Sequence, residues 1–174
     1  MKIPKYSKLE NERRFFVGSL TGLALPELDF VHISDLYIDT THMRLRSVSG
    51  ADGSIIYKLC KKYPKDNNYS GPIVNTYLSV EEYAVFNALP GRRLNKKRYR
   101  ISYEEIVFGV DVFEGQLGGL ILCEVEMQTR EQLESVRFPA WAKQEVTEDD
   151  FFTGGHLSRL TANQLQEKLL SVQP

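Results

Sequence analysis

Charged side chains recur at even spacing in five stretches that otherwise have the composition of β-strands. Successive side chains of a strand point to opposite faces, so residues two or four positions apart share a face. Several of these sets carry a single sign, rather than the interspersed signs of an ordinary solvated face. The sets are Glu10, Glu12 and Arg14; Arg44 and Arg46; Lys58 and Lys62; Lys96, Arg98 and Arg100; and Glu124 and Glu126.

A sheet with one apolar and one charged face can bury both by closing on itself. An antiparallel sheet normally leaves one face to solvent. In a closed barrel the charged faces turn inward, and the apolar faces turn outward, where helices must cover them. Eight strands enclose a lumen just wide enough for a small ligand. If the sheet closes in this way, the fold is α+β and mainly β: an antiparallel barrel with flanking helices.

Capping and turn residues in the sequence indicate where helices and strands begin and end. A Ser-Val-Glu-Glu capping box at 79–82 begins a helix that ends at Pro90-Gly91. Strands are expected at 10–17, 35–39, 43–48, 54–62, 74–78, 94–103, 106–113, 120–127 and, briefly, 145–147. Further helices are expected at 132–136 and, after a break at 154–155, at 162–170; segments 23–28 and 64–72 are expected to be loops, the first with a short helical turn.

The length of 174 residues predicts one domain, residues 1–174, with a core at about 10–158 and a C-terminal helix within 159–174. Lysine and arginine (22) nearly balance aspartate and glutamate (23), so net charge predicts neither a nucleic-acid nor a membrane partner. No apolar run approaches the length of a membrane span, and no signal-peptide core follows residues 1–4. We expect a cytoplasmic protein.

The balance hides local segregation of charge. Six of the nine residues at 92–100 are basic, whereas 104–150 holds twelve acidic and three basic residues. With Tyr99 and Tyr103 as stacking faces, the basic run also fits single-stranded nucleic acid. The Arg44/Arg46 and Lys58/Lys62 sets, each taken alone, are more typical of solvated strand faces than of binding sites.

The remaining reactive residues form no recognisable constellation. His32, His42 and His156 lie far apart with no ligand spacing, and His156 is retained only as a candidate proton donor. Cys60 and Cys123 have no metal-ligand spacing. A lumen with basic side chains on one wall and carboxylates on another suits a phosphate chain with its divalent metal.

Six motifs, in order, resemble those of the CYTH, or triphosphate tunnel metalloenzyme, superfamily. Residues 10–17 (Glu-Asn-Glu-Arg-Arg-Phe-Phe-Val) resemble its N-terminal Glu-x-Glu-x-Lys signature. The others are Met-Arg-Leu-Arg at 43–46, Lys-Leu-Cys-Lys-Lys at 58–62, Lys-Lys-Arg-Tyr at 96–99, the stretch 110–126 ending in Glu-Val-Glu, and Pro-Ala-Trp at 139–141 with Glu-Val-Thr at 145–147. The resemblance spans residues 10 to about 158, and it implies an α+β, mainly β fold: an eight-stranded antiparallel closed barrel (tunnel) with flanking helices.

The resemblance implies metal-dependent hydrolysis of a triphosphate, inorganic tripolyphosphate or a related organic one, with Mg²⁺ or Mn²⁺. It implies catalytic roles for Glu12, Glu126 and Arg14; metal ligation by Glu10, Glu12, Asp111, Glu124 and Glu126; and substrate binding by Arg44, Arg46, Lys58, Lys62, Lys96 and Arg98. The partner is a small-molecule triphosphate. The sequence leaves the oligomeric state open, a homodimer included.

Three positions depart from the family pattern. Arg14 replaces the signature lysine and cannot transfer a proton near neutral pH. The strand at 73–77 lacks a carboxylate, and residues 153–155 replace an expected asparagine. Alternatives therefore stay open: a phosphate-, polyphosphate- or nucleotide-binding module with little turnover, cyclase-like use of ATP, or a nucleic-acid binder.

Overall fold

The computed structural model describes residues 4–21, 23, 25, 30–65 and 67–172. Its strands are β1 (Lys8–Phe16), β2 (Phe30–Ile38), β3 (Met43–Ser49), β4 (Ile55–Lys62), β5 (Ser70–Leu78), β6 (Gly91–Tyr103), β7 (Ile106–Phe113), β8 (Ile121–Met127) and β9 (Gln144–Glu145). Its helices are α1 (Val80–Asn87), α2 (Arg130–Ser135), α3 (Gly154–Leu157) and α4 (Ala162–Val172), with 3₁₀ turns at Gly115–Leu117 and Asp150–Phe152.

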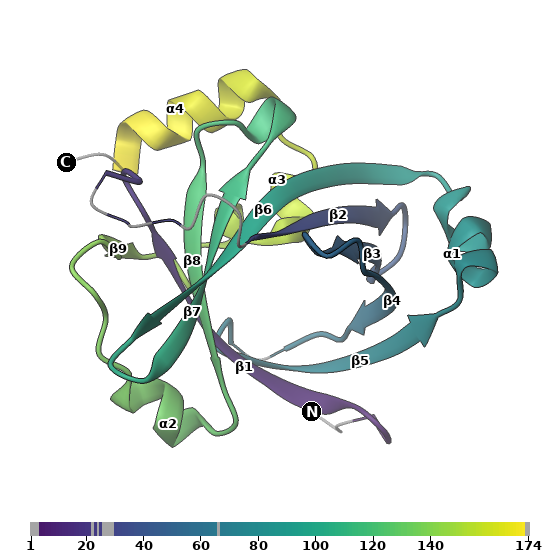
Figure 1. Ribbon diagram of the computed structural model, residues 1–174, viewed down its shortest axis with the longest axis horizontal. Helices are drawn as coiled ribbons and strands as arrows, with labels where there is room; N and C mark the ends of the chain where they lie inside the picture. The colour runs from purple at the N-terminus through teal and green to yellow at the C-terminus, as the bar shows by residue number, and fades with distance from the viewer. Residues whose placement is uncertain (1–3, 22, 24, 26–29, 66, 173–174) are drawn as a thin grey trace.

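The strands of the described chain form one antiparallel sheet in the order β5-β4-β3-β2-β6-β7-β8-β1-β9. A further pairing of β5 with β1 closes the first eight strands into a barrel (Figure 1). Strand β1 makes this possible because it changes partner along its length: its first half pairs with β5 and its last two residues pair with β9. The predicted eight-stranded closed barrel is confirmed.

Helices and loops cover the apolar outer face of the barrel, as expected. Leu36 and Leu45 point outward from β2 and β3 and pack with Tyr83 and Phe86 of α1. On the opposite side, outward residues of β1, β7 and β8 pack against Leu133 of α2 and against the 136–142 segment. Figure 1 shows α1 and α2 at opposite edges of the barrel.

One end of the lumen is filled by a second apolar cluster. Along the strands the inward residues change from charged to apolar, ending in Phe16, Leu94, Phe113 and Leu122. Phe152, Leu157 of α3 and the buried face of α4 pack onto these residues, forming a floor that we call the plug (residues 150–172). Burial of this apolar face accounts for the position of the C-terminal segment against the barrel.

Most expected elements occur, with shifted ends. The α1 capping box between Ser79 and Glu82 is present, and the 106–113 strand is as predicted. Strand β5 begins at Ser70 rather than 74. Pro72 does not prevent this earlier start, because a missing N–H is tolerated near the beginning of a strand. The expected break at 154–155 is wrong: Gly154 begins α3. Much of the predicted 23–28 loop lies outside the described residues.

No helix within the described residues is both long enough and apolar enough to cross a membrane.

Candidate active site

The barrel encloses a cavity of about 720 Å³ lined by the inward-facing residues of most strands and by the plug. Around the ring, β7, β8 and β1, whose inward charges are mainly carboxylates, are neighbours. Inward cations come from β6, β3 and β4, and β2, which lies between β6 and β3, carries none. We call β7, β8 and β1 the acidic wall, and β6, β2, β3 and β4 the basic wall. The segregation that the sequence led us to expect is therefore present, although each wall holds one exception.

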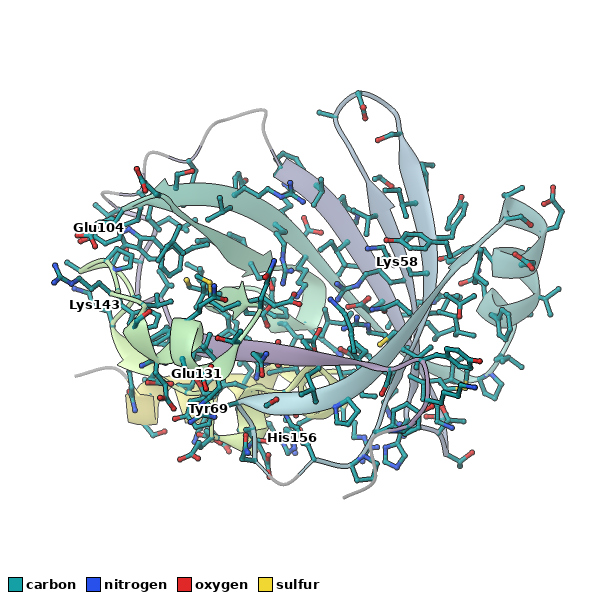
Figure 2. All side chains as sticks on the ribbon, turned by 90° about the horizontal axis from the view of Figure 1, so that it is seen from below. Lys58, Tyr69, Glu104, Glu131, Lys143 and His156 are labelled. Atoms are coloured by element: carbon teal, nitrogen blue, oxygen red, sulfur yellow. The ribbon has the colours of Figure 1, made fainter. Side chains whose placement is uncertain are left out.

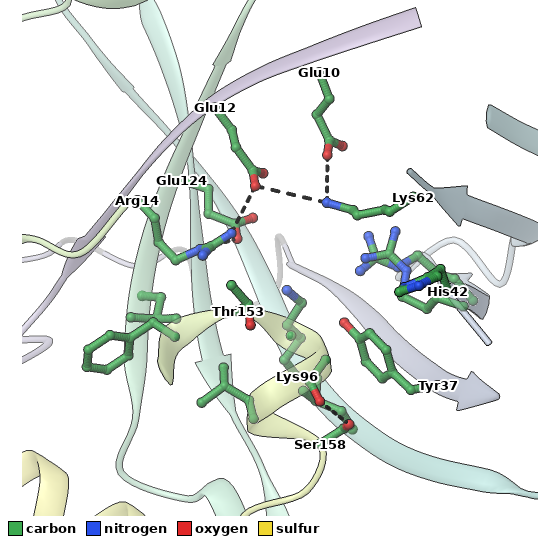
Figure 3. Close-up of a pocket in the computed structure, with 18 of the residues that line it drawn as sticks. Glu10, Glu12, Arg14, Tyr37, His42, Lys62, Lys96, Glu124, Thr153 and Ser158 are labelled. Carbon is green, nitrogen blue, oxygen red and sulfur yellow. Dashed lines mark hydrogen bonds and ion pairs between the residues drawn. The ribbon is translucent and has the colours of Figure 1, made fainter. Parts of the chain in front are cut away.

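The exception on the acidic wall is Arg14, which is only 7% exposed. The β1–β8 register places Arg14 opposite Glu124, and Glu12 opposite Glu126. The Arg14 guanidinium donates to Glu12 at 3.0 Å through Nη2 and to Glu124 at 3.1 Å through Nε (Figure 3). Arg14 thereby separates two carboxylates that would otherwise repel across adjacent strands.

Glu124 lies at the centre of the acidic wall and has both oxygens engaged. One accepts from Arg14 and the other from Nη2 of Arg98. Burial favours the neutral carboxyl, but Arg98, Lys96 and Arg14 outweigh it and hold the pKa of Glu124 well below its ordinary value of 4.5. Glu124 is therefore a fixed negative charge.

Asp111 is fully buried where the two walls meet. Its Oδ1 accepts from Nε of Arg98 at 2.6 Å, and its Oδ2 accepts from Nη2 of Arg98 at 2.6 Å and from Nζ of Lys96 at 2.5 Å. Both oxygens thus contact cations rather than the open lumen. Burial lowers the pKa of Lys96, and the ion pair with Asp111 compensates only in part.

Three other carboxylates keep one oxygen free of hydrogen bonds to any described residue. Glu10 accepts from Lys62 at 2.6 Å, Glu12 accepts only from Arg14, and Glu126 only from Lys8 at 3.1 Å. The Lys62 ammonium lies between Glu10 and Glu12, 4.0 Å from the latter (Figure 3). These two carboxylates raise the pKa of Lys62 against the effect of burial.

The described chain contains no ready-made cluster of three His, Cys, Asp or Glu side chains around a metal position. Lys62 and Arg14 occupy the space between the carboxylates instead. The donor chemistry nevertheless fits a hard cation, because Glu10, Glu12 and Glu126 each offer an oxygen and face one lumen from adjacent strands. A bound cation would take over the charge neutralisation that the Lys62 ammonium supplies here.

The exception on the basic wall is Asp35, which is 1% exposed and which sequence reasoning did not select. Arg46 donates to it twice, through Nε at 2.6 Å and Nη2 at 2.7 Å, and Nε of Arg44 lies 3.6 Å away. Burial opposes ionisation, yet Arg46 and Arg44 keep the pKa of Asp35 far below its ordinary value of 3.8. The β2–β3 register, which pairs Asp35 with Arg46, is the cause.

Besides Asp111, two predicted residues lie outside the cavity lining. Lys58 is on the inner face of β4 but outside the residues that line the cavity; its Nζ lies 5.4 Å from the Tyr77 ring centre (Figure 2). His156 is an exposed residue of α3 that lies against Phe151 and does not line the cavity (Figure 2). The plug contributes Thr153, Gly154 and Ser158 to the lining; the sequence had marked 153–155 only as a departure from the family pattern and did not indicate Ser158.

Fold and lining together define a class: a closed antiparallel barrel with a segregated charged lumen. The chain is 40% identical over 146 residues to a protein named inorganic triphosphatase from Nitrosomonas europaea, covering 80% of this chain and 90% of that protein. A solved structure of an inorganic triphosphatase superposes with a TM-score of 0.56 at 27% identity, covering 86% of this chain and 93% of that chain. No protein-family model matches the chain.

A proposed adenylate cyclase from Bacillus halodurans shares the fold alone, with a TM-score of 0.53 at 20% identity over 74% of this chain and 86% of that chain. On the strength of the triphosphatase relative and the barrel, the chain belongs to the CYTH, or triphosphate tunnel metalloenzyme, superfamily.

Proposed function

We propose that this protein hydrolyses inorganic tripolyphosphate inside the barrel, with Mg²⁺ or Mn²⁺ as cofactor. The observation that carries the proposal is the lumen, in which two walls of opposite charge face one cavity. Triphosphatase activity is also the named activity of the relative that is 40% identical. A cavity of about 720 Å³ is in the size range of small-molecule sites.

The basic wall binds the phosphate chain. Arg44, Arg46, Lys96 and Arg98 come from β3 and β6 on either side of β2, so they can contact successive phosphates rather than one. Charge-assisted hydrogen bonds to phosphate oxygens stabilise the charge that spreads over the transferred phosphoryl group. Lys62 pairs with Glu10 in this structure, and with a cation held by Glu10 and Glu12 its ammonium would be available to this wall.

Glu10, Glu12 and Glu126 would hold the divalent cation, which supplies charge neutralisation and polarisation of the phosphate oxygens. Glu124 and Asp111 were also predicted as ligands. We assign them instead to charge pairing, since every oxygen of both side chains already accepts from an arginine or lysine.

Glu126 is the best-placed acceptor for a proton of the attacking water. It lies opposite Glu12 in the β1–β8 pair, and its contact with Lys8 is solvent exposed and weak. Arg14 does not transfer a proton; it fixes Glu12 and Glu124 in place. Water attacks the terminal phosphorus in line, the phosphoanhydride bond breaks, and pyrophosphate leaves with phosphate as the other product.

The test is phosphate release from tripolyphosphate, ATP, thiamine triphosphate and pyrophosphate, each with Mg²⁺, Mn²⁺ or EDTA. We expect release from tripolyphosphate that EDTA abolishes and either metal restores. Undiminished hydrolysis in EDTA would remove the carboxylates from the metal role. Tight binding without release would favour a binding module, and a cyclic nucleotide formed from ATP would favour a cyclase.

A further inference from the structure

Asp35 is the most completely buried carboxylate on the basic wall, and it contacts no part of the cavity. Its two oxygens accept a parallel pair of hydrogen bonds from Arg46, the geometry in which an arginine–carboxylate pair has least freedom. Arg46 is therefore held in one orientation before any ligand arrives.

Arg44 differs from Arg46 in making no hydrogen bond to Asp35. Its Nε is a buried side-chain nitrogen for which the described residues provide no hydrogen-bond partner. At 3.6 Å, Asp35 attracts this guanidinium without accepting a hydrogen bond from it. This nitrogen is enclosed by protein and faces Asp35, so it is the charge attraction of Asp35, and not a hydrogen bond, that holds Arg44 where its side chain lines the cavity.

We infer that Asp35 is a positioning residue for phosphate binding: it locks Arg46 directly and attracts Arg44, so that both arginines are held in place where they line the cavity. The inference rests on the proposed function, because it names how the basic wall of that site is organised. Asp35 itself touches neither phosphate nor metal and acts through the two arginines.

A simpler role would be to moderate charge. A carboxylate behind two arginines lowers the positive potential of the wall, and removing it would tighten the binding of a polyanion. Positioning and moderation thus predict opposite signs for a neutral substitution. Two variants of Asp35 distinguish positioning from moderation. One removes the negative charge without changing the shape of the side chain, and the other keeps the charge but displaces it.

The experiment compares Asp35→Asn and Asp35→Glu with the parent. Asparagine keeps the shape but offers one acceptor oxygen instead of two, and glutamate keeps the charge but displaces it by one methylene. We expect both to raise the Kd and KM for tripolyphosphate about tenfold with kcat within about threefold, as for loss of one charge-assisted contact. Binding is measured by calorimetry with Mg²⁺ under conditions that prevent turnover, and KM by phosphate release.

Glu145→Gln is the matched control. Glu145 makes the same two-point contact with Arg13, at 2.9 and 2.6 Å, but lies outside the cavity lining. It should lower the melting temperature and leave KM and Kd unchanged. A second check uses Arg44→Met: in that background Asp35→Asn should weaken binding by less than it does alone, since part of its effect passes through Arg44.

Two results would overturn the inference. If Asp35→Asn tightens binding and Asp35→Glu leaves it unchanged, Asp35 only moderates charge. If both variants lower the melting temperature as the control does, while Kd and KM stay at the parent values, Asp35 is structural. Either result leaves the proposed function standing, whereas a parent protein that neither binds nor hydrolyses tripolyphosphate contradicts the proposed function itself.

Discussion

Each wall of the lumen contains one buried residue of the opposite charge, and the two walls use it differently. On the acidic wall Arg14 lies between Glu12 and Glu124 and donates to both. On the basic wall Asp35 is saturated by Arg46 and leaves Nε of Arg44 without a partner. The acidic wall is thus internally paired around its arginine, and the basic wall is paired only in part.

This difference separates stability from binding. Deleting the partner of a buried, paired charge destabilises the fold by several kcal/mol, because the remaining charge stays buried without a counter-charge. Arg44 makes no hydrogen bond to Asp35, and Asp35 keeps both of its hydrogen bonds from Arg46, so removing Arg44 leaves no carboxylate unpaired. Removing Arg44 is therefore expected to affect the proposed phosphate binding more than the fold.

The largest expected effect is on the acidic wall. Arg14→Met keeps the apolar stem but leaves Glu12 and Glu124 facing each other, and we expect the free energy of unfolding to fall by about 3–5 kcal/mol. Urea unfolding monitored by circular dichroism measures it. Added Mg²⁺ should restore part of the loss by replacing the missing positive charge. A stability equal to the parent's would mean that Arg14 is not the counter-charge of this wall.

The matched change on the basic wall, Arg44→Met, should act on binding instead. Asp35 keeps its two bonds from Arg46, so the free energy of unfolding should change by less than about 1 kcal/mol. The Kd for tripolyphosphate should rise about tenfold to a hundredfold, the value of a charge-assisted contact of about 1.5–3 kcal/mol. If Arg44→Met destabilises the fold as strongly as Arg14→Met, the comparison between the walls fails.

Glu12→Gln sharpens the comparison within the proposed metal site. It removes one negative charge with almost no change of shape, so metal affinity should fall and turnover should drop about tenfold or more. Tripolyphosphate binding in EDTA should be unchanged or tighter, because a repulsive carboxylate is gone and the basic wall is intact. Parallel loss of both properties would indicate that Glu12 also holds the basic wall together.

The smallest effect concerns acid stability. Because the folded-state pKa of Glu124 lies well below 4.5, Glu124 contributes stability that is present above about pH 4.5 and is lost as the pH falls through the folded-state pKa. Glu124→Gln should therefore be less stable than the parent at neutral pH, and the gap should narrow as the pH falls below about 4.5. Urea midpoints at several pH values measure it, and a constant gap would contradict the assignment.

Sequence alone was sufficient to predict which charged residues of a strand share a face. Parity along a strand fixes the face, so Glu10, Glu12 and Arg14 had to point the same way, as did Arg44 and Arg46. The pairing of those side chains depends on strand order and register. Arg14 meets Glu124 across a sequence separation of 110 residues, which no local pattern encodes.

Asp35 shows the same limit at shorter range. It lies only 11 residues from Arg46, but a shift of one residue in the β2–β3 register would turn it away from both arginines. The plug was equally hidden. Its helix α4 has few apolar residues, yet Leu165 and Leu169 are one turn apart and both are buried against the barrel end.

The floor of the lumen lies close to Tyr37 because Gly154 has no Cβ. A Cβ added to Gly154 would lie 1.9 Å from Oη of Tyr37, so any larger residue must lift the floor or displace the tyrosine. The plug thus sets the depth of the cavity through the packing of an uncharged residue, Gly154, against Tyr37. Under the proposed function, a larger residue at 154 would shift this floor and change how long a phosphate chain fits, without replacing any charged side chain of the two walls.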